Sequence, residues 1–185
     1  MENNDGRIKM PYAKFGSGPK TLVIIPGMSV TNVTDAADAV AKRYAMFCDY
    51  TGYIFDRGEK LSSVEAMAEE TYAGMKSLGI EKPYIFGASQ GGMIAMCIAA
   101  NHPEYPAKIC VSSTSAVENL LYKRVCDRWR ALCQSGDKKA LFEDMNERMY
   151  CKQTLELIKK NRRKLQRDCR RYVPLYKDTR LKPRL

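Results

Sequence analysis

Short apolar runs alternate with segments of helical periodicity over residues 20–115. Four runs have the length and the flanking turn residues of strands, namely 22–25, 50–55, 83–86 and 109–111. Between them, apolar residues recur at spacings of three and four over 35–47 and 64–78, and residues 92–100 are apolar on nearly every side. Strands that are buried on both faces read as continuous apolar runs. The order therefore predicts an α/β fold, a mostly parallel sheet with crossover helices on both faces.

The pattern changes after residue 116. Apolar side chains step by three and four from Val117 to Leu165, and no bounded β-branched run interrupts them. This spacing predicts helices and no further strand. We therefore expect a partial core over 1–115, a helical segment over 116–165, and a basic, poorly packed tail over 166–185.

The positive charge is concentrated at one end of the chain. The net charge is +10, yet residues 1–150 are balanced, whereas residues 151–185 carry 13 Lys and Arg against 3 Asp and Glu. A basic block of this kind can hold an anionic partner. It offers only Tyr172 and Tyr176 for stacking, so a solvated helix face is the better interpretation and nucleic-acid binding is disfavoured.

Composition excludes several other classes. The longest apolar run, 91–100, is too short to span a bilayer, and the acidic start Met1-Glu2-Asn3-Asn4-Asp5 does not resemble a secretory signal, so we expect a cytoplasmic protein. Seven cysteines form no CxxC pair, which favours reduced thiols. With a single histidine there is no set of zinc ligands, and we expect neither a metal nor a cofactor.

One pentapeptide carries a chemical signal. Gly87-Ala88-Ser89-Gln90-Gly91 matches G-x-S-x-G and lies between the predicted strand 83–86 and the predicted helix 92–100. Such a sharp turn strains the serine backbone and presents its hydroxyl at the sheet edge, while Gly87 and Gly91 avoid collisions with neighbouring backbone. The Gln90 N–H, at a helix N-terminus, favours an oxyanion in the same space.

A second donor is expected from the loop after strand 22–25. The loop reads Pro26-Gly27-Met28-Ser29, and we select the Met28 N–H. Taken alone, the glycines and serine of the pentapeptide could simply form a tight turn. The order of strand, elbow, helix and upstream glycine loop favours an oxyanion hole instead.

Together these motifs resemble the α/β-hydrolase family, in particular bacterial stand-alone serine hydrolases with an oxyanion loop PG[LM]S and an elbow FGASQGGMIA. The matching segments are 15–18, 25–29, 53–57, 67–70, 86–95 and 102–104. The resemblance implies an esterase-like hydrolase of a small-molecule acyl substrate, with Ser89 as nucleophile and the N–H groups of Met28 and Gln90 as oxyanion hole. It also implies that residues 116–165 are the helical cap of that fold.

The chain departs from this pattern in its catalytic base and acid. The family order is Ser, then Asp or Glu, then His, and neither later segment is found here. His102 lies thirteen residues after Ser89 along one predicted helix, roughly 20 Å away, so we expect it to end the helix before Pro103. Asp56 is expected to pair with Arg57 or a backbone amide, and Glu118 to lie in the first turn of a helix.

We therefore expect weak activity or none from the chain alone. Three explanations stay open: a truncated or frameshifted hydrolase, a natural short relative that keeps the pocket for binding or scaffolding, or a histidine supplied by another chain. We favour the first, because missing strands leave an open sheet edge that invites self-association. Residual hydrolysis from the oxyanion hole is a further hypothesis. The alternative function is a non-catalytic module whose residues 151–185 hold an anionic partner.

Overall fold

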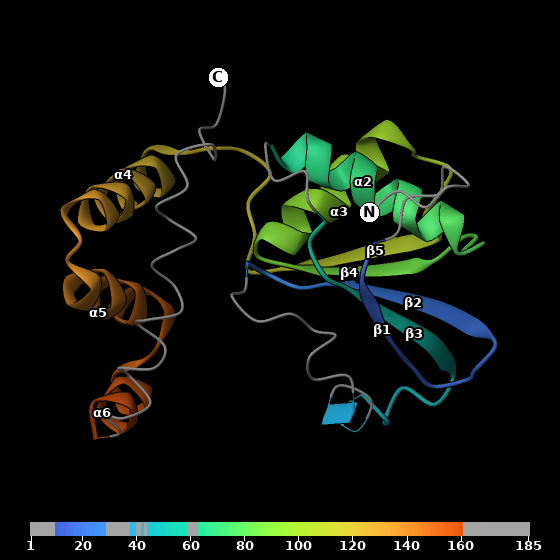
Figure 1. Cartoon of the computed structure of the whole chain (residues 1–185), viewed down its shortest axis with the longest axis horizontal. Coiled ribbons are helices and arrows are strands. Elements are labelled where there is room, and N and C mark those ends of the chain that lie inside the picture. Colours follow the sequence, from blue (N-terminus) through green and yellow to red (C-terminus); the bar gives the residue numbers. More distant parts are fainter. Residues whose placement is uncertain (1–9, 29–37, 40–41, 43, 59–62, 161–185) are drawn as a thin grey trace. The chain divides into compact units, whose positions relative to one another are not determined.

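A computed structural model describes residues 10–28, 38–39, 42, 44–58 and 63–160 of the chain. The chain divides after Ala116 into two compact units, a sheet with helices and then a run of helices (Figure 1). Of the helix expected over 35–47, residues 38, 39 and 42 are helical and residues 44–46 form a turn, whereas residues 35–37, 40, 41 and 43 lie outside the described residues. The expected tail, 166–185, lies wholly outside them.

Five strands form one mixed sheet in the order β1-β3-β2-β4-β5 (Figure 1). Strand β1 is antiparallel to β3, and the pairs β2–β3, β2–β4 and β4–β5 are parallel. All four predicted strands are present, and the predicted α/β class with a mostly parallel sheet is confirmed. The bounds are Tyr12–Phe15 (β1), Lys20–Ile25 (β2), Tyr50–Phe55 (β3), Tyr84–Ala88 (β4) and Lys108–Ser112 (β5).

Strand β1 was not predicted from the sequence. Its side chains alternate, with Ala13 and Phe15 buried and Tyr12 and Lys14 exposed. That is the period-two pattern of a half-buried strand, but four residues give a weak signal. The segment becomes a strand because it pairs with β3, where Tyr12 lies opposite Phe55.

Two helices, α2 (Val64–Ser77) and α3 (Gln90–Asn101), lie on one face of the sheet (Figure 1). Ser63 caps the start of α2, because its hydroxyl accepts a hydrogen bond from the Ala66 N–H at 3.1 Å. Both helices bury apolar side chains against the sheet in one cluster, and the opposite face of the sheet carries a smaller one around Phe15. The main cluster includes Val23, Ile25, Phe55, Met67, Ala68, Met75, Ile85, Ile94, Ala95 and Ile98.

The second unit contains helices α4 (Leu120–Ser135), α5 (Lys138–Met149) and α6 (Lys152–Lys160). Within the described residues, the segment after 116 is helical as predicted. Cys133 of α4 packs on Leu141 and Met145 of α5, with Trp129 and Leu132 at the margin of the cluster. This spacing of apolar residues is what produced the helical prediction.

Helix α4 starts later than expected. The Asn119 side chain accepts a hydrogen bond from the Tyr122 N–H at 2.9 Å and caps the helix. Glu118 therefore lies before the cap, and the prediction that it occupies the first helical turn was wrong. Asparagine is among the best N-cap residues, so the helix begins after it.

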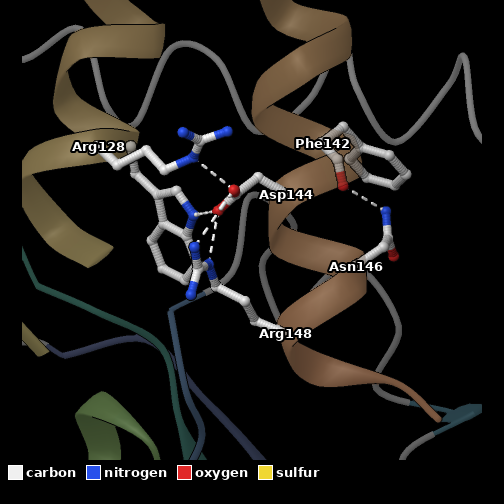
Figure 2. Close-up of polar contacts among 6 residues, drawn as sticks. Arg128, Phe142, Asp144, Asn146 and Arg148 are labelled. Atoms are coloured by element: carbon white, nitrogen blue, oxygen red, sulfur yellow. Dashed lines mark hydrogen bonds and ion pairs between the residues drawn. The ribbon is translucent and has the colours of Figure 1, made fainter. Parts of the chain in front are cut away.

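A buried carboxylate joins α4 to α5 (Figure 2). Asp144 is 8% exposed and accepts hydrogen bonds from Arg128 Nε at 2.5 Å, Trp129 Nε1 at 2.8 Å and Arg148 Nε at 2.7 Å. The Arg148 hydrogen bond, supported by Trp129 and Arg128, lowers the pKa of Asp144 to about 2. Asp144 is therefore charged at neutral pH and holds the two helices together.

Neither a membrane-crossing helix nor a metal-binding cluster occurs among the described residues. None of their helices has both the length and the apolar character needed to cross a membrane. No group of three or more His, Cys, Asp or Glu side chains among them is arranged to hold a metal ion.

Candidate active site

Ser89 occupies the junction between β4 and α3 with a strained backbone. Its φ is 52° and its ψ is −121°, a combination that non-glycine residues rarely adopt. The surrounding structure holds this conformation. The Ser89 N–H donates to the Ser112 carbonyl at 2.9 Å, and the Ser89 carbonyl accepts from the Gly92 N–H at 2.9 Å and from the Thr114 hydroxyl at 2.7 Å.

Both predicted elbow glycines, Gly87 and Gly91, are required by close backbone contacts. A Cβ atom on Gly91 would lie 1.9 Å from the Ile25 carbonyl oxygen, and one on Gly87 would lie 2.4 Å from the Gly91 carbonyl oxygen. Neither backbone partner can move freely, because both belong to the sheet or to α3. The start of α3 therefore packs directly on the end of β2, as the G-x-S-x-G geometry requires.

The loop after β2 passes beside Ser89. A Cβ atom on Gly27 would lie 3.2 Å from Ser89 Cβ and 3.7 Å from Ser89 Oγ. Met28 follows Gly27 directly in the chain, and Gln90 follows Ser89 as the first residue of α3. The role of the Met28 and Gln90 N–H groups as an oxyanion hole stays a prediction, and Ser29 lies outside the described residues.

Arg57 is a site residue whose role the sequence did not predict. Its Nε donates to Gln90 Oε1 at 3.1 Å, and its Nη2 donates to the Pro26 carbonyl. Burial lowers the pKa of Arg57 to about 10, while the charge of Asp56 opposes that shift. Arg57 therefore stays a cation at neutral pH and touches both loops that flank Ser89. The sequence signal that could have identified Arg57 is its position just after β3, a strand that pairs with β2.

A sequence model of the α/β-hydrolase fold matches residues 17–145, more than half of the chain. The chain belongs to the α/β-hydrolase fold family. The match includes β2, the Ser89 turn and α3, which are the elements that build this site. The resemblance seen in the sequence motifs is thereby confirmed at the level of the family.

Solved structures of α/β hydrolases share the fold. MGS-M2, an α/β hydrolase enzyme from a Medee basin deep-sea metagenome library, superposes with a TM-score of 0.72 at 20% identity, covering 93% of this chain and 64% of that protein. A thermophilic esterase from Thermogutta terrifontis superposes with a TM-score of 0.58 at 19% identity, covering 83% and 58%.

A sequence relative is the serine hydrolase BPHL of Mus musculus. It is 27% identical over 118 residues, which cover 59% of this chain and 40% of the mouse protein. The chain thus spans less than two thirds of the length of each of these α/β hydrolases.

The only histidine of this α/β-hydrolase chain lies at the far end of α3. His102 ends the helix as predicted, and its N–H donates to the Ile98 carbonyl at 2.8 Å. Its Nε2 is 3.1 Å from Glu69 Oε2, and its ring stacks on Tyr72 with centroids 3.7 Å apart. Thirteen helical positions separate it from Ser89 by roughly 20 Å, so it cannot accept the serine proton.

Asp56 is a candidate for neither base nor acid in the expected mechanism. It follows β3, is 6% exposed, and lies beside the Arg57 guanidinium, which feels its charge. A carboxylate in this position supports a cation and has no imidazole to orient. The described residues therefore contain a candidate nucleophile and oxyanion loops, without a histidine next to them.

Proposed function

We propose that the chain is an esterase-like serine acyl hydrolase in which Ser89 is the nucleophile. The N–H groups of Met28 and Gln90 form the oxyanion hole, and the substrate is a small acyl compound. The observation that carries this proposal is the strained backbone of Ser89 next to the Gly27 loop. A strained backbone conformation persists only where the surrounding structure holds it, and strain of this kind clusters at active sites.

The chemistry follows from these groups. Ser89 Oγ attacks the acyl carbon, the carbonyl oxygen becomes an oxyanion held by the two N–H groups, and the leaving alcohol departs to give an acyl-serine that water hydrolyses. The serine proton needs a base, and His102 lies too far away to serve as one. We therefore propose that the chain alone reacts slowly, at a rate set by positioning and oxyanion stabilisation.

Imidazole in solution should replace the missing base. We expect slow labelling of the purified chain by a fluorophosphonate probe, and acceleration by about tenfold or more as neutral imidazole is added at constant ionic strength. The rate is measured by gel fluorescence over time, with sodium chloride in place of imidazole as the control. Absence of labelling in both conditions would refute the proposed function, whereas fast labelling without imidazole would refute the slow reaction.

The alternative, a non-catalytic module that holds an anionic partner, depends on residues 151–185. Only α6 of this segment, up to residue 160, lies within the described residues. The observations around Ser89 favour the hydrolase, and the anion-binding module stays the second hypothesis.

We further propose that the chain self-associates through β5. All five residues of this strand are exposed, and within the described residues it pairs only with β4. Ile109 and Val111 are each 38% exposed, although Ile85, the neighbour of Ile109 on β4, is 1% exposed. An apolar edge strand of this kind is a template for another strand.

The sequence of β5 suits an antiparallel copy of itself. Centred on Cys110, the pairing places Ile109 opposite Val111, Lys108 opposite Ser112, and Cys110 opposite its equivalent in the second copy. Apolar residues then meet apolar residues, and no like charges face each other. The two Cys110 Cα atoms would be about 4.5 to 5.5 Å apart, which is within disulfide range.

Mild oxidation should therefore trap a covalent dimer through Cys110. We expect the dimer on non-reducing gels with wild type and with Cys151→Ser, a matched exposed cysteine, and its loss in Cys110→Ser. Val111→Lys should convert the dimer to a monomer in sedimentation analysis, since an edge lysine blocks strand pairing. A wild-type monomer at all concentrations, or a dimer unaffected by both β5 variants, would contradict this interface.

A further inference from the structure

Three strand ends converge beside Ser89. Strands β3, β2 and β4 are parallel neighbours, so their carboxyl ends meet at the same edge of the sheet. Arg57 follows β3, Pro26 follows β2, and Gln90 follows Ser89 at the end of β4. The guanidinium is therefore placed where it can reach both segments that flank the nucleophile.

The two hydrogen bonds of Arg57 fall on those two segments. Nη2 donates to the carbonyl of Pro26, two residues before Met28, and Nε donates to the side chain of Gln90 at 3.1 Å. A guanidinium is planar and presents its donors in a fixed fork, so bonds from two of its nitrogens fix the distance between their acceptors. A lysine ammonium at this position would lack that geometry.

The burial of one Arg57 nitrogen is energetically unfavourable. Its Nη1 is buried and has no hydrogen-bond partner among the described residues. An unsatisfied buried donor on a charged group is unfavourable, and uncharged side chains of similar length would avoid it. The presence of a guanidinium here is explained if its hydrogen bonds to Pro26 and Gln90 have a function that an uncharged side chain cannot provide.

We propose that Arg57 is a positioning residue, which braces the Pro26–Met28 loop against the start of α3 and so sets the spacing of the two oxyanion-hole N–H groups. This inference rests on the proposed acyl-hydrolase function, because the brace matters for the reaction only if Ser89 is the nucleophile. Arg57 itself acts through Met28 and Gln90, and it does not contact the reacting atoms.

Hydrogen exchange tests the brace without reference to activity. In Arg57→Ala we expect faster amide exchange at Gly27 and Met28, read from peptides spanning 22–28 by mass spectrometry, and unchanged exchange in β4 and the middle of α3. Arg124→Ala, which removes an exposed arginine of α4, is the matched control and should match wild type. Circular dichroism checks that each variant is folded. Arg57→Lys provides a milder variant if Arg57→Ala does not fold.

Labelling of Ser89 tests the consequence. Complete removal of one oxyanion donor costs about 10²- to 10³-fold in rate, so a displaced donor should reduce the fluorophosphonate rate constant by about tenfold to a hundredfold. Arg57→Lys should stay slow although it keeps the charge, and methylguanidinium in solution should partly restore Arg57→Ala. Gln90→Met keeps the main-chain N–H, removes one contact of the brace and should cause a smaller loss.

The outcomes separate the two proposals. If wild type shows no Ser89-dependent labelling, the hydrolase function fails, and the exchange data still decide whether Arg57 braces the loop. If Arg57→Ala is folded and both its labelling rate and its exchange at Gly27 and Met28 equal those of wild type, Arg57 is not a positioning residue. The positioning role would also be refuted if Arg57→Ala labels more slowly, methylguanidinium does not restore its rate, and its exchange at Gly27 and Met28 is unchanged.

Discussion

Replacing Ser89 with alanine should abolish covalent labelling of the chain by a fluorophosphonate probe. The probe reacts with an activated serine hydroxyl, and the turn between β4 and α3 presents this one beside the Gly27 loop. Removing Oγ leaves the N–H groups of Met28 and Gln90 in place, so the variant loses the proposed nucleophile and keeps the proposed oxyanion hole. In-gel fluorescence measures the loss, and peptide mass spectrometry locates the adduct in wild type.

A matched control separates this effect from a general change in the protein. Ser135 is an exposed serine at the end of α4, where its hydroxyl donates to the Leu132 carbonyl. Ser135→Ala should label at the wild-type rate. An adduct on any residue other than Ser89, or equal labelling of Ser89→Ala and wild type, would show that the strained turn is not the reactive site.

Asp144→Ala should strongly destabilise the second unit. The carboxylate accepts hydrogen bonds from Arg128, Trp129 and Arg148, and its loss leaves the donors on α4 and α5 without their shared acceptor. Because the arginines are partly exposed and can be rehydrated, we expect a loss of about 1 to 3 kcal/mol in the free energy of unfolding. Trp129 is the only tryptophan of the chain, so its fluorescence during urea unfolding reports on this unit.

The control is a carboxylate in an exposed pair. Asp127 bonds Arg130 at 2.6 Å, and its side chain is about half exposed. Asp127→Ala should change the free energy of unfolding by less than about 0.5 kcal/mol, because exposed pairs contribute little. Equal stability of Asp144→Ala and Asp127→Ala would mean that the Asp144 cluster does not hold α4 to α5.

The same carboxylate predicts a pH dependence. Its pKa is lowered from 3.8 to about 2 in the folded chain, so the folded state favours the charged form. The stability from Asp144 is therefore fully present above pH values of about 4 to 5 and is lost as the pH falls toward about 2. Asp144→Asn should remove this part of the acid sensitivity of the Trp129 transition. If Asp144→Asn has the same acid profile as wild type, other carboxylates cause the acid sensitivity of this transition.

Local sequence signals were sufficient for most elements of the fold. Four predicted strands are present in the structure, at 22–25, 50–55, 83–86 and 109–111. They could be predicted because each apolar run and its flanking turn residues are adjacent in the sequence. The Ser89 turn was recognisable for the same reason, since its two glycines and serine are adjacent. Strand β1 escaped prediction because its four residues carry little signal before they meet β3.

The chain's own pattern thus determined the α/β class, the helical segment after residue 116, the place of Ser89 and the lack of a nearby histidine, because each depends on spacing along one element. The tertiary structure decided which strand ends meet. Only the order β3-β2-β4 brings Arg57 to Pro26 and Gln90, and only the end position of β5 leaves its apolar side chains exposed. Such contacts join residues more than thirty positions apart, and no local periodicity encodes them.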